Sequence, residues 1–262
     1  MKVPAAIAAL ALVAVTGFLL LSGEDDSGGS PPGSADGPLG ALRASIPLPD
    51  YSLVAPPADD VPGPSYPLAT VRAGHTVVLR DRPQGEVIAR LGDETEFGSV
   101  RRLWIAEVSG DWFGVPAPEL GNGQLGWIRD DRTALEVSQT PYSVDVDVSE
   151  QSLELRYGDA VLDRIPVTVG SPSSPTPLGS YAVTDGLVGG GLGPYYGCCV
   201  LALTGHQPNL PASWLGGDRI AIHGTPDVVG GARSSGCLRA SNPDMVSLFA
   251  RVPLGAPVFI HA

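Results

Sequence analysis

The chain has 262 residues and a formal net charge of −12, with 16 Lys and Arg against 28 Asp and Glu. Proteins that grip a phosphate backbone gather Lys and Arg on one surface, so this charge excludes nucleic acid as a partner. Lys2 is the only lysine, which excludes Schiff-base and P-loop chemistry after the N-terminus. The 34 Gly and 26 Pro favour β structure with many turns.

Residues 1–22 predict a membrane anchor or a signal. The run from Val3 to Leu21 is uncharged and approaches the roughly 20 residues that a helix needs to cross a bilayer. No A-x-A-like cleavage site and no lipid-attachment cysteine follows it, so an uncleaved anchor is favoured over a cleaved signal. Lys2 precedes the run and acidic residues 24–26 follow it, which places the bulk of the chain outside the cytoplasm, in the cell envelope.

Residues 23–66 are rich in Gly, Pro, Ser and Asp. Such a segment buries too little apolar surface to offset its ordering entropy, so we expect a disordered linker.

Residues 67–138 predict a small β barrel. Runs such as "TVVLRDRP", "EVIARL" and "GQLGWIRD" alternate β-forming and polar residues around Gly-Asp and Asn-Gly turns. The stretches "VVLRDRPQGEVIARL" and "GDWFGV…NGQLGWI" resemble bacterial SH3-like domains. Trp104, Trp112 and Trp127 could line a groove for glycan or peptide, or they could be core residues.

Residues 141–262 predict a second, mostly β domain with one short helix. Period-2 runs at Val144–Val148 and Leu153–Leu155, and the runs "CCVLAL", "RIAIHG" and "APVFIHA", indicate strands. A long Gly-rich loop, "GLVGGGLGPYYG", interrupts them. The helix is expected over residues 243–251, with Asn242 as its N-cap.

The chemistry of this domain centres on Cys237. Acyl transfer needs a nucleophile, a base and an oxyanion site, and Cys237 supplies a thiol. His223 ends an apolar strand and is the candidate base. The backbone N–H groups of Gly236 and Cys237 could form an oxyanion hole, and Arg239 could support the loop or the thiolate. A thiolate–imidazolium pair would lower the Cys pKa, raise the His pKa and give a bell-shaped pH profile.

Cys198 and Cys199 are adjacent, and three pairings stay open. They form a vicinal disulfide, they are two free buried thiols, or one of them is bridged to Cys237. A zinc set made of these three cysteines and His206 is a further alternative, although the spacing lacks the usual C-x2–4-C pair. No metal and no cofactor is expected.

Together these motifs resemble the YkuD-type L,D-transpeptidases, which remodel bacterial peptidoglycan. That family carries a His followed, some fourteen or more residues later, by [S/T]-x-G-C-hydrophobic-[N/R]. This chain has "HGT" at 223–225, "SSGCLR" at 234–239 and a family-like "PTPLG" turn at 175–179. The resemblance spans residues 141–262, and a wall-binding SH3-like module fits the same setting. The expected fold is therefore mostly β: an SH3-like barrel followed by a β-rich YkuD-type domain with one short helix.

The resemblance assigns roles. Cys237 is the nucleophile, His223 the general acid and base, and the carbonyl of Gly224 orients the imidazole. The substrate-binding residues that it implies are Tyr195, Tyr196, Thr225, Ser234 and Ser235. Ser235 stands where many members carry a second His, so a role of that imidazole is absent or passes to the serine hydroxyl.

The implied reaction joins two peptidoglycan stem peptides. Cys237 attacks a tetrapeptide stem at the carbonyl of an L-configured centre of a diamino acid, and D-Ala leaves. The side-chain amine of a second stem then takes the acyl group, which gives a 3→3 cross-link. With water as the acceptor the enzyme would be an L,D-carboxypeptidase. The rival hypothesis is a wall-binding protein that keeps the fold without activity.

Overall fold

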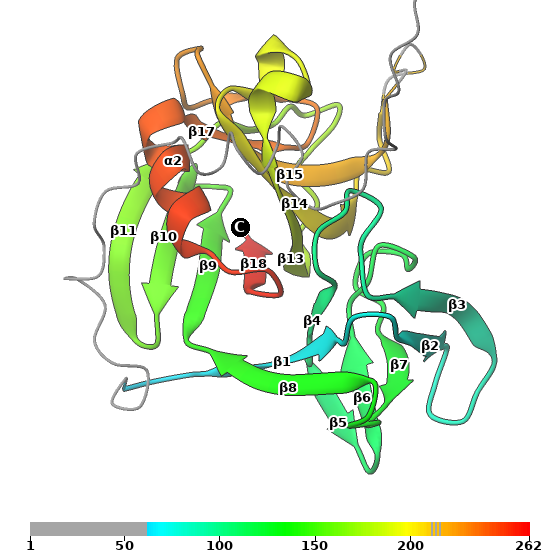
Figure 1. Ribbon diagram of the computed structural model, residues 1–262. Coiled ribbons are helices and arrows are strands. Elements are labelled where there is room, and N and C mark those ends of the chain that lie inside the picture. The colour runs from blue at the N-terminus through cyan, green and yellow to red at the C-terminus, as the bar shows by residue number, and fades with distance from the viewer. Residues whose placement is uncertain (1–61, 211, 213, 215) are drawn as a thin grey trace, which may run out of the picture.

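The computed structural model describes residues 62–262 except 211, 213 and 215 (Figure 1). The predicted anchor at 1–22 and nearly all of the predicted linker lie outside these residues. Within the described part of the chain, no helix is long and apolar enough to cross a membrane.

Residues 66–140, here called the N-terminal module, form two small antiparallel sheets. One has the strand order β4-β1-β8 and the other β3-β2-β7-β6-β5. Alternate residues of these strands point into one core that includes Leu79, Leu91 and Ile128, as the period-2 pattern predicts. The strands are β1 Tyr66–Val71, β2 Thr76–Arg80, β3 Val87–Gly92, β4 Arg102–Trp104, β5 Glu107–Ser109, β6 Trp112–Val115, β7 Gly126–Arg129 and β8 Leu135–Thr140.

Residues 141–262, here called the C-terminal domain, are built on an eight-stranded sheet of order β11-β10-β9-β18-β13-β14-β15-β17. A parallel pair, β12 and β16, lies beside it. The strands are β9 Tyr142–Asp147, β10 Ser152–Tyr157, β11 Ala160–Pro166, β12 Val169–Gly170, β13 Gly179–Val188, β14 Cys199–His206, β15 Arg219–Thr225, β16 Ala232–Ser234, β17 Leu238–Ser241 and β18 Pro257–His261. The mostly β fold class with one short α-helix is confirmed for the described residues.

The helix, α2 (Asn242–Arg251), buries Met245, Leu248 and Phe249, which share one face at helical spacing. Its N-cap is Ser241, whose hydroxyl accepts a hydrogen bond from the Asp244 N–H. The prediction that Asn242 caps the helix was therefore wrong by one residue. The Asn242 side chain instead accepts the N–H of Cys198 at 2.9 Å.

The Gly-rich loop is shorter than the sequence predicted. β13 continues through Val188, because Gly186, Leu187 and Val188 pair with the start of β14. Two 3-10 turns complete the connection, η3 (Gly189–Gly191) and η4 (Pro194–Tyr196).

The two parts of the chain share a packed boundary. Figure 1 shows β8 running directly into β9, and only Pro141 separates the two strands. Leu68, Trp104 and Ala182 form a buried cluster against Phe259, and the Trp104 and Phe259 rings meet edge to face with centroids 5.7 Å apart. Trp104 is therefore an interface residue and no part of an exposed ligand groove.

Replacing Trp104 with alanine should weaken the coupling between the unfolding of the N-terminal module and the unfolding of the C-terminal domain. Large-to-small changes at buried aromatic residues cost about 3–5 kcal/mol, and here the loss falls on the boundary. Urea unfolding should show a lower midpoint and two resolved transitions instead of one. Trp112→Ala is the control, since that side chain is only half-buried. Equal losses in both variants would contradict a boundary role for Trp104.

Candidate active site

His223 lies in β15, the strand next to the edge strand β17, and has a strand on each side. β15 pairs antiparallel with β14, where Val200 faces His223, and parallel with β17, where Arg239 faces His223. The residue is buried. The ring of Tyr196, from η4, approaches the imidazole with centroids 5.0 Å apart. The strand pairing therefore fixes the backbone of His223, and Tyr196 covers its ring.

The tautomer of His223 follows from one hydrogen bond. Nδ1 lies 2.8 Å from the carbonyl oxygen of Gly224. A carbonyl oxygen only accepts, so Nδ1 carries the proton and Nε2 keeps its lone pair. A neutral imidazole held in this way can accept a proton through Nε2.

Cys237 lies in the turn between β16 and β17 and is a free thiol. The preceding residue, Gly236, has φ +109°, a conformation that side-chain-bearing residues rarely adopt. A Cβ there would also collide with the side-chain amide of Gln207. The glycine of the motif is thus required by backbone geometry and by close packing.

The same turn uses the hydroxyl of Ser234. Ser234 Oγ donates to the carbonyl of Cys237 at 2.6 Å and accepts the N–H of Gly236 at 3.1 Å. The Gly236 N–H therefore has a partner within the turn, which corrects its assignment as an oxyanion donor. Ser234 is buried, so its hydroxyl shapes the loop instead of meeting substrate.

The electrostatics of the pair differ from the predicted ion pair. Burial, opposed by the hydrogen bond to Gly224, lowers the pKa of His223 to about 4. Burial raises the pKa of the Cys237 thiol, although the backbone of Ala221 and the charge of Arg239 lower it. Both shifts are opposite in sign to the prediction, because desolvation disfavours the charged form of each group. The site therefore rests as a neutral thiol and a neutral imidazole.

Cys198 and Cys199 are bonded to each other, so the reading with a bridge to Cys237 is wrong. The zinc reading is wrong as well. Its fourth member, His206, uses Nδ1 on Asp218 at 2.9 Å and Nε2 on the carbonyl of Pro118 at 2.8 Å. The disulfide packs behind Gly224, where an added Cβ would lie 3.3 Å from Cys198 Sγ. It therefore supports the residue whose carbonyl holds His223.

Of the other predicted site residues, some lie beside Cys237 and His223 and others do not. Arg239 and Tyr196 lie beside the pair, and the pKa of Tyr196 is raised by burial and by Cys237. Ser235 is partly exposed in the turn. Tyr195 points away, with 72% of its surface exposed. Thr225 is buried and its hydroxyl accepts the Asp227 N–H, so it is a structural residue of the strand end.

Sequence reasoning missed Gln207. This buried side chain donates to the carbonyl of Pro175 at 2.8 Å, accepts the N–H of Asn209 at 2.9 Å and packs on Gly236. Gln207 thereby joins the "PTPLG" turn to the cysteine turn. Within the "PTPLG" turn, Thr176 Oγ1 accepts the Gly170 N–H. No local pattern marks a glutamine in a loop for such a role.

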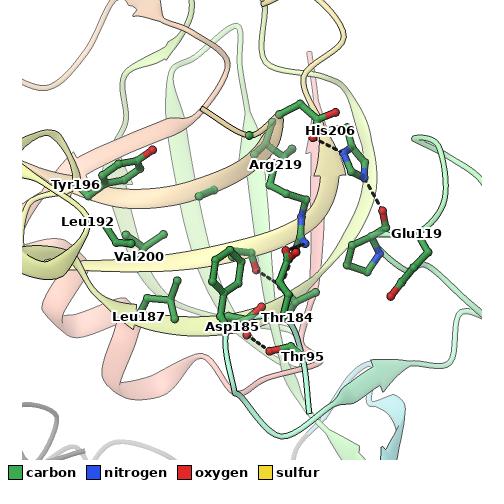
Figure 2. Close-up of a pocket in the computed structure, with 18 of the residues that line it drawn as sticks. Thr95, Glu119, Thr184, Asp185, Leu187, Leu192, Tyr196, Val200, His206 and Arg219 are labelled. Carbon is green, nitrogen blue, oxygen red and sulfur yellow. Dashed lines mark hydrogen bonds and ion pairs between the residues drawn. The ribbon is translucent and has the colours of Figure 1, made fainter. Parts of the chain in front are cut away.

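A cleft of about 580 Å³ opens beside the pair (Figure 2). Its walls come from β13, β14 and β15 on one side and from loops of the N-terminal module on the other. Tyr196, which covers His223, and Ala221, whose backbone hydrogen-bonds to Cys237, both line it. The cleft therefore adjoins the pair through these two neighbours, whereas His223 and Cys237 are not among its lining residues.

Comparison with known proteins finds relatives of the C-terminal domain. Residues 141–260 match the YkuD family model, described as the L,D-transpeptidase catalytic domain. The YkuD protein of Bacillus subtilis is 30% identical over 125 residues, and that of Bacillus licheniformis is 30% identical over 128 residues. Each match covers 46% of this chain and 66% of the relative, just short of two thirds of its length. Residues 141–260 therefore resemble a YkuD-type L,D-transpeptidase catalytic domain.

Solved structures align over about half of the chain. An L,D-transpeptidase from Mycobacterium smegmatis is 16% identical with a TM-score of 0.36, over 53% of this chain and 73% of that one. L,D-transpeptidase 3 from Mycobacterium tuberculosis is 17% identical with a TM-score of 0.35, over 53% and 74%. At these values the structural alignments add nothing to the assignment, which rests on the sequence matches.

The low pKa of His223 should make the fold sensitive to acid. The unfolded imidazole binds a proton near pH 6.5, whereas the folded one stays neutral down to about pH 4. Stability from this residue is therefore full above pH 6.5 and is lost as the pH falls toward 4, by up to about 3 kcal/mol. His223→Gln should remove that part of the decline. Urea unfolding at pH 7.5 and pH 4.5 measures it, and equal pH dependence in both proteins would contradict the assignment.

Proposed function

We propose that this protein is a peptidoglycan L,D-transpeptidase that forms 3→3 cross-links through a thioester on Cys237. The observation that supports this most is the fixed tautomer of His223. Its Nδ1–H is held by the Gly224 carbonyl, which leaves Nε2 as a base within a domain of the matching family. No carboxylate is needed, since the carbonyl does the orienting that an Asp does in a serine-protease triad.

The acylation step starts from two neutral groups. As Cys237 Sγ attacks the carbonyl of the diamino acid's L-centre, its proton passes to His223 Nε2. The tetrahedral intermediate then collapses, the C–N bond breaks, and His223 returns the proton to the amine of the leaving D-Ala. The backbone N–H of Cys237 is the oxyanion donor of this proposal, since the Gly236 N–H is engaged.

The second step reverses these roles. An acceptor amine attacks the thioester, its proton passes to His223, and the C–S bond breaks to restore the thiol. Arg239, beside His223 in the parallel strand, lowers the pKa of both groups by its charge. It therefore favours a neutral imidazole and, in the transition state, the developing thiolate.

The N-terminal module is part of the same proposal. We keep the reading of residues 67–138 as an SH3-like wall-binding module, with the chain attached to the membrane by residues 1–22 in the cell envelope. Trp112 is half-buried and lines a second, smaller hollow with Arg129 and Thr76. Trp112 and Trp127 are the two tryptophans left for a ligand, because Trp104 is buried at the boundary.

Cys237→Ala should abolish acyl-enzyme formation while the fold persists. Intact mass spectrometry after incubation with a carbapenem should show one adduct on the wild type and none on the variant.

His223→Gln should slow acylation about 10²–10⁴-fold, the usual worth of a general base. Muropeptides digested after incubation with tetrapeptide stems should contain the 3→3 dimer. Release of D-Ala with tripeptides alone would identify a carboxypeptidase instead, and an adduct on Cys237→Ala would exclude the mechanism.

Thiol alkylation should report the neutral resting pair. Because the pKa of Cys237 is raised, iodoacetamide should react slowly at pH 7 and faster as the pH rises beyond the usual thiol range near 8.5. The rate should show no acid-side maximum. Intact mass across pH 5–10 measures the profile, with His75→Ala, an exposed turn residue, as the control. A bell with its maximum near neutrality would instead reveal a thiolate–imidazolium pair.

A further inference from the structure

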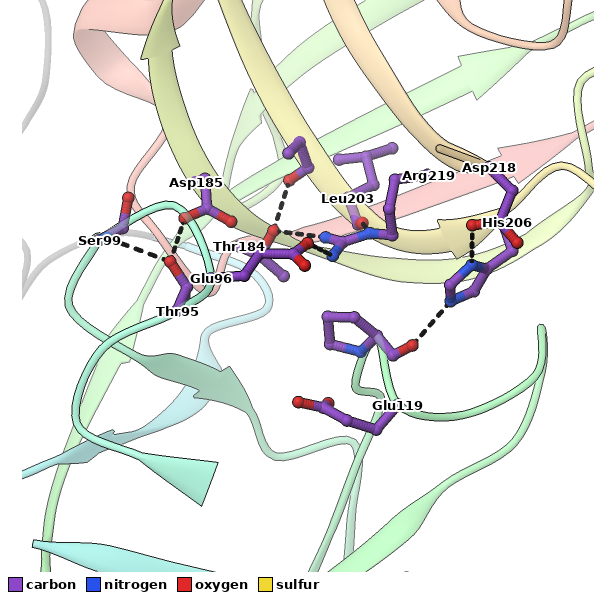
Figure 3. A network of polar contacts seen from close by, with 12 residues as sticks. Thr95, Glu96, Ser99, Glu119, Thr184, Asp185, Leu203, His206, Asp218 and Arg219 are labelled. Atoms are coloured by element: carbon purple, nitrogen blue, oxygen red, sulfur yellow. Dashed lines mark hydrogen bonds and ion pairs between the residues drawn. The ribbon is translucent and has the colours of Figure 1, made fainter. Parts of the chain in front are cut away.

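The cleft beside the active pair is built by both parts of the chain. The N-terminal module supplies Thr95, Glu96 and Phe97 from one loop and Pro118 and Glu119 from another. Polar contacts fasten these loops to the sheet. Asn122 pairs with the backbone of His206 at 2.7 and 2.8 Å, and His206 Nε2 lies 2.8 Å from the Pro118 carbonyl. Glu96 contacts Arg219, and Thr95 contacts Asp185 (Figure 3). The cleft therefore has fixed walls.

A buried carboxylate with an unused oxygen lines this cleft. Asp185, in β13, is fully buried. Its Oδ1 accepts from the Thr95 hydroxyl, whereas its Oδ2 has no hydrogen-bond partner among the residues that the structure describes. Leaving a buried acceptor unsatisfied is costly, so this oxygen calls for a donor that the described residues 62–262 do not provide.

The nearby cation does not fill that role. Arg219 donates to the Leu203 carbonyl at 2.7 Å, to Thr184 Oγ1 at 2.8 Å and to Glu96 at 2.8 Å (Figure 3). These three hydrogen bonds thus go to acceptors other than Asp185. Taken over the whole lining, the carboxylates of Glu96, Glu119, Asp185 and Asp218 outnumber the guanidinium groups of Arg101 and Arg219. The cleft carries an excess of negative charge.

The wall nearest the active pair is apolar. Leu187, Leu192, Val200 and Phe97 line it, and Phe97 and Leu192 are both exposed to solvent. Figure 2 shows Leu187, Leu192 and Val200 between Asp185 and Tyr196. An aliphatic chain could pack there, with a charged end at the carboxylates.

We propose that this cleft binds an aliphatic side chain that ends in a primary ammonium. This is the protonated form of the amine acceptor, and it loses one proton to water before its nitrogen attacks the thioester. An ammonium group has three donors and no acceptor, so it suits Asp185 Oδ2 and the Glu96 carboxylate. The role of this amine as an acceptor rests on the proposed function. The binding of the ammonium itself does not depend on catalysis. The N-terminal module would then shape acceptor choice, because it supplies Glu96 and Phe97.

Calorimetry on full-length Cys237→Ala protein tests the binding without chemistry. The probes are N-acetyl-L-lysine amide and N-acetyl-L-norleucine amide, its uncharged counterpart of similar length. We expect the lysine probe to bind and the norleucine probe to bind at least about ten-fold more weakly, the worth of one charge-assisted hydrogen bond. Equal affinity for the two probes would overturn the proposal, and so would displacement of the lysine probe by micromolar Ca²⁺.

Variants locate the site. Asp185→Asn and Glu96→Gln should each weaken lysine binding about ten-fold, and Glu107→Gln, an exposed carboxylate of β5 outside the cleft, should not. Glu96 keeps the test valid if Asp185→Asn fails to fold, since its side chain is mostly exposed. Unchanged binding in Glu96→Gln together with unchanged binding in a folded Asp185→Asn would overturn the site.

A final measurement separates this proposal from the proposed function. In proteins with Cys237 intact, Asp185→Asn and Glu96→Gln should keep the acylation rate with a carbapenem and shift product from cross-linked dimer to hydrolysed tripeptide. Loss of acylation in the wild type would sink the proposed function and leave amine binding to be judged by calorimetry alone. Normal acylation with an unchanged ratio of dimer to hydrolysis product would overturn the acceptor role.

Discussion

The parallel pairing of β15 with β17 is the constraint on which the site depends. It aligns His223 with Arg239 and Ile222 with Leu238, and both apolar partners are completely or almost completely buried. Because a parallel pair needs a long connection, the chain from residue 226 to 237 must return along the sheet and deliver Cys237 just before the strand. The core contact thus sets the positions of His223, Arg239 and the turn that carries Cys237.

The described groups that hold His223 and its neighbours from behind are uncharged. The Gly224 carbonyl holds the ring, the Cys198–Cys199 disulfide packs against Gly224, and the Asn242 amide holds the backbone of Cys198. A carboxylate in the place of the carbonyl would favour the imidazolium. The carbonyl leaves burial as the largest effect, which explains why the pKa of His223 falls to about 4 and why the base rests unprotonated at neutral pH.

The N-terminal module is joined to the C-terminal domain by apolar and polar contacts of different kinds. Trp104 packs on Phe259 in a dry cluster, whereas Asn122, His206 and Glu96 make hydrogen bonds and an ion pair across the boundary. The apolar cluster supplies most of the adhesion. The polar contacts fix the relative orientation of the two parts, because each contact needs a particular partner. They therefore define the walls of the cleft.

The sequence by itself determined most of the elements and the candidate groups for the reaction. Alternation of apolar residues marked β9 and β10, and the helical spacing of Met245, Leu248 and Phe249 is that of an amphipathic helix. The order of His223, Gly236 and Cys237 is a local signature whose geometry needs a glycine at positive φ. These features depend on neighbours along the chain, which a pattern can record.

Only the tertiary structure decided the rest. Desolvation comes from residues distant in the sequence, so the signs of the His223 and Cys237 pKa shifts followed from burial and not from the presence of the pair. Gln207 and Asp185 carry no motif; their roles arise from what folding places opposite them, the cysteine turn for one and the Thr95 loop for the other. Likewise the sequence allowed Trp104 to be a ligand residue, whereas in the structure its ring packs against Phe259. Such contacts join positions with no periodic relation, and a local pattern holds no record of them.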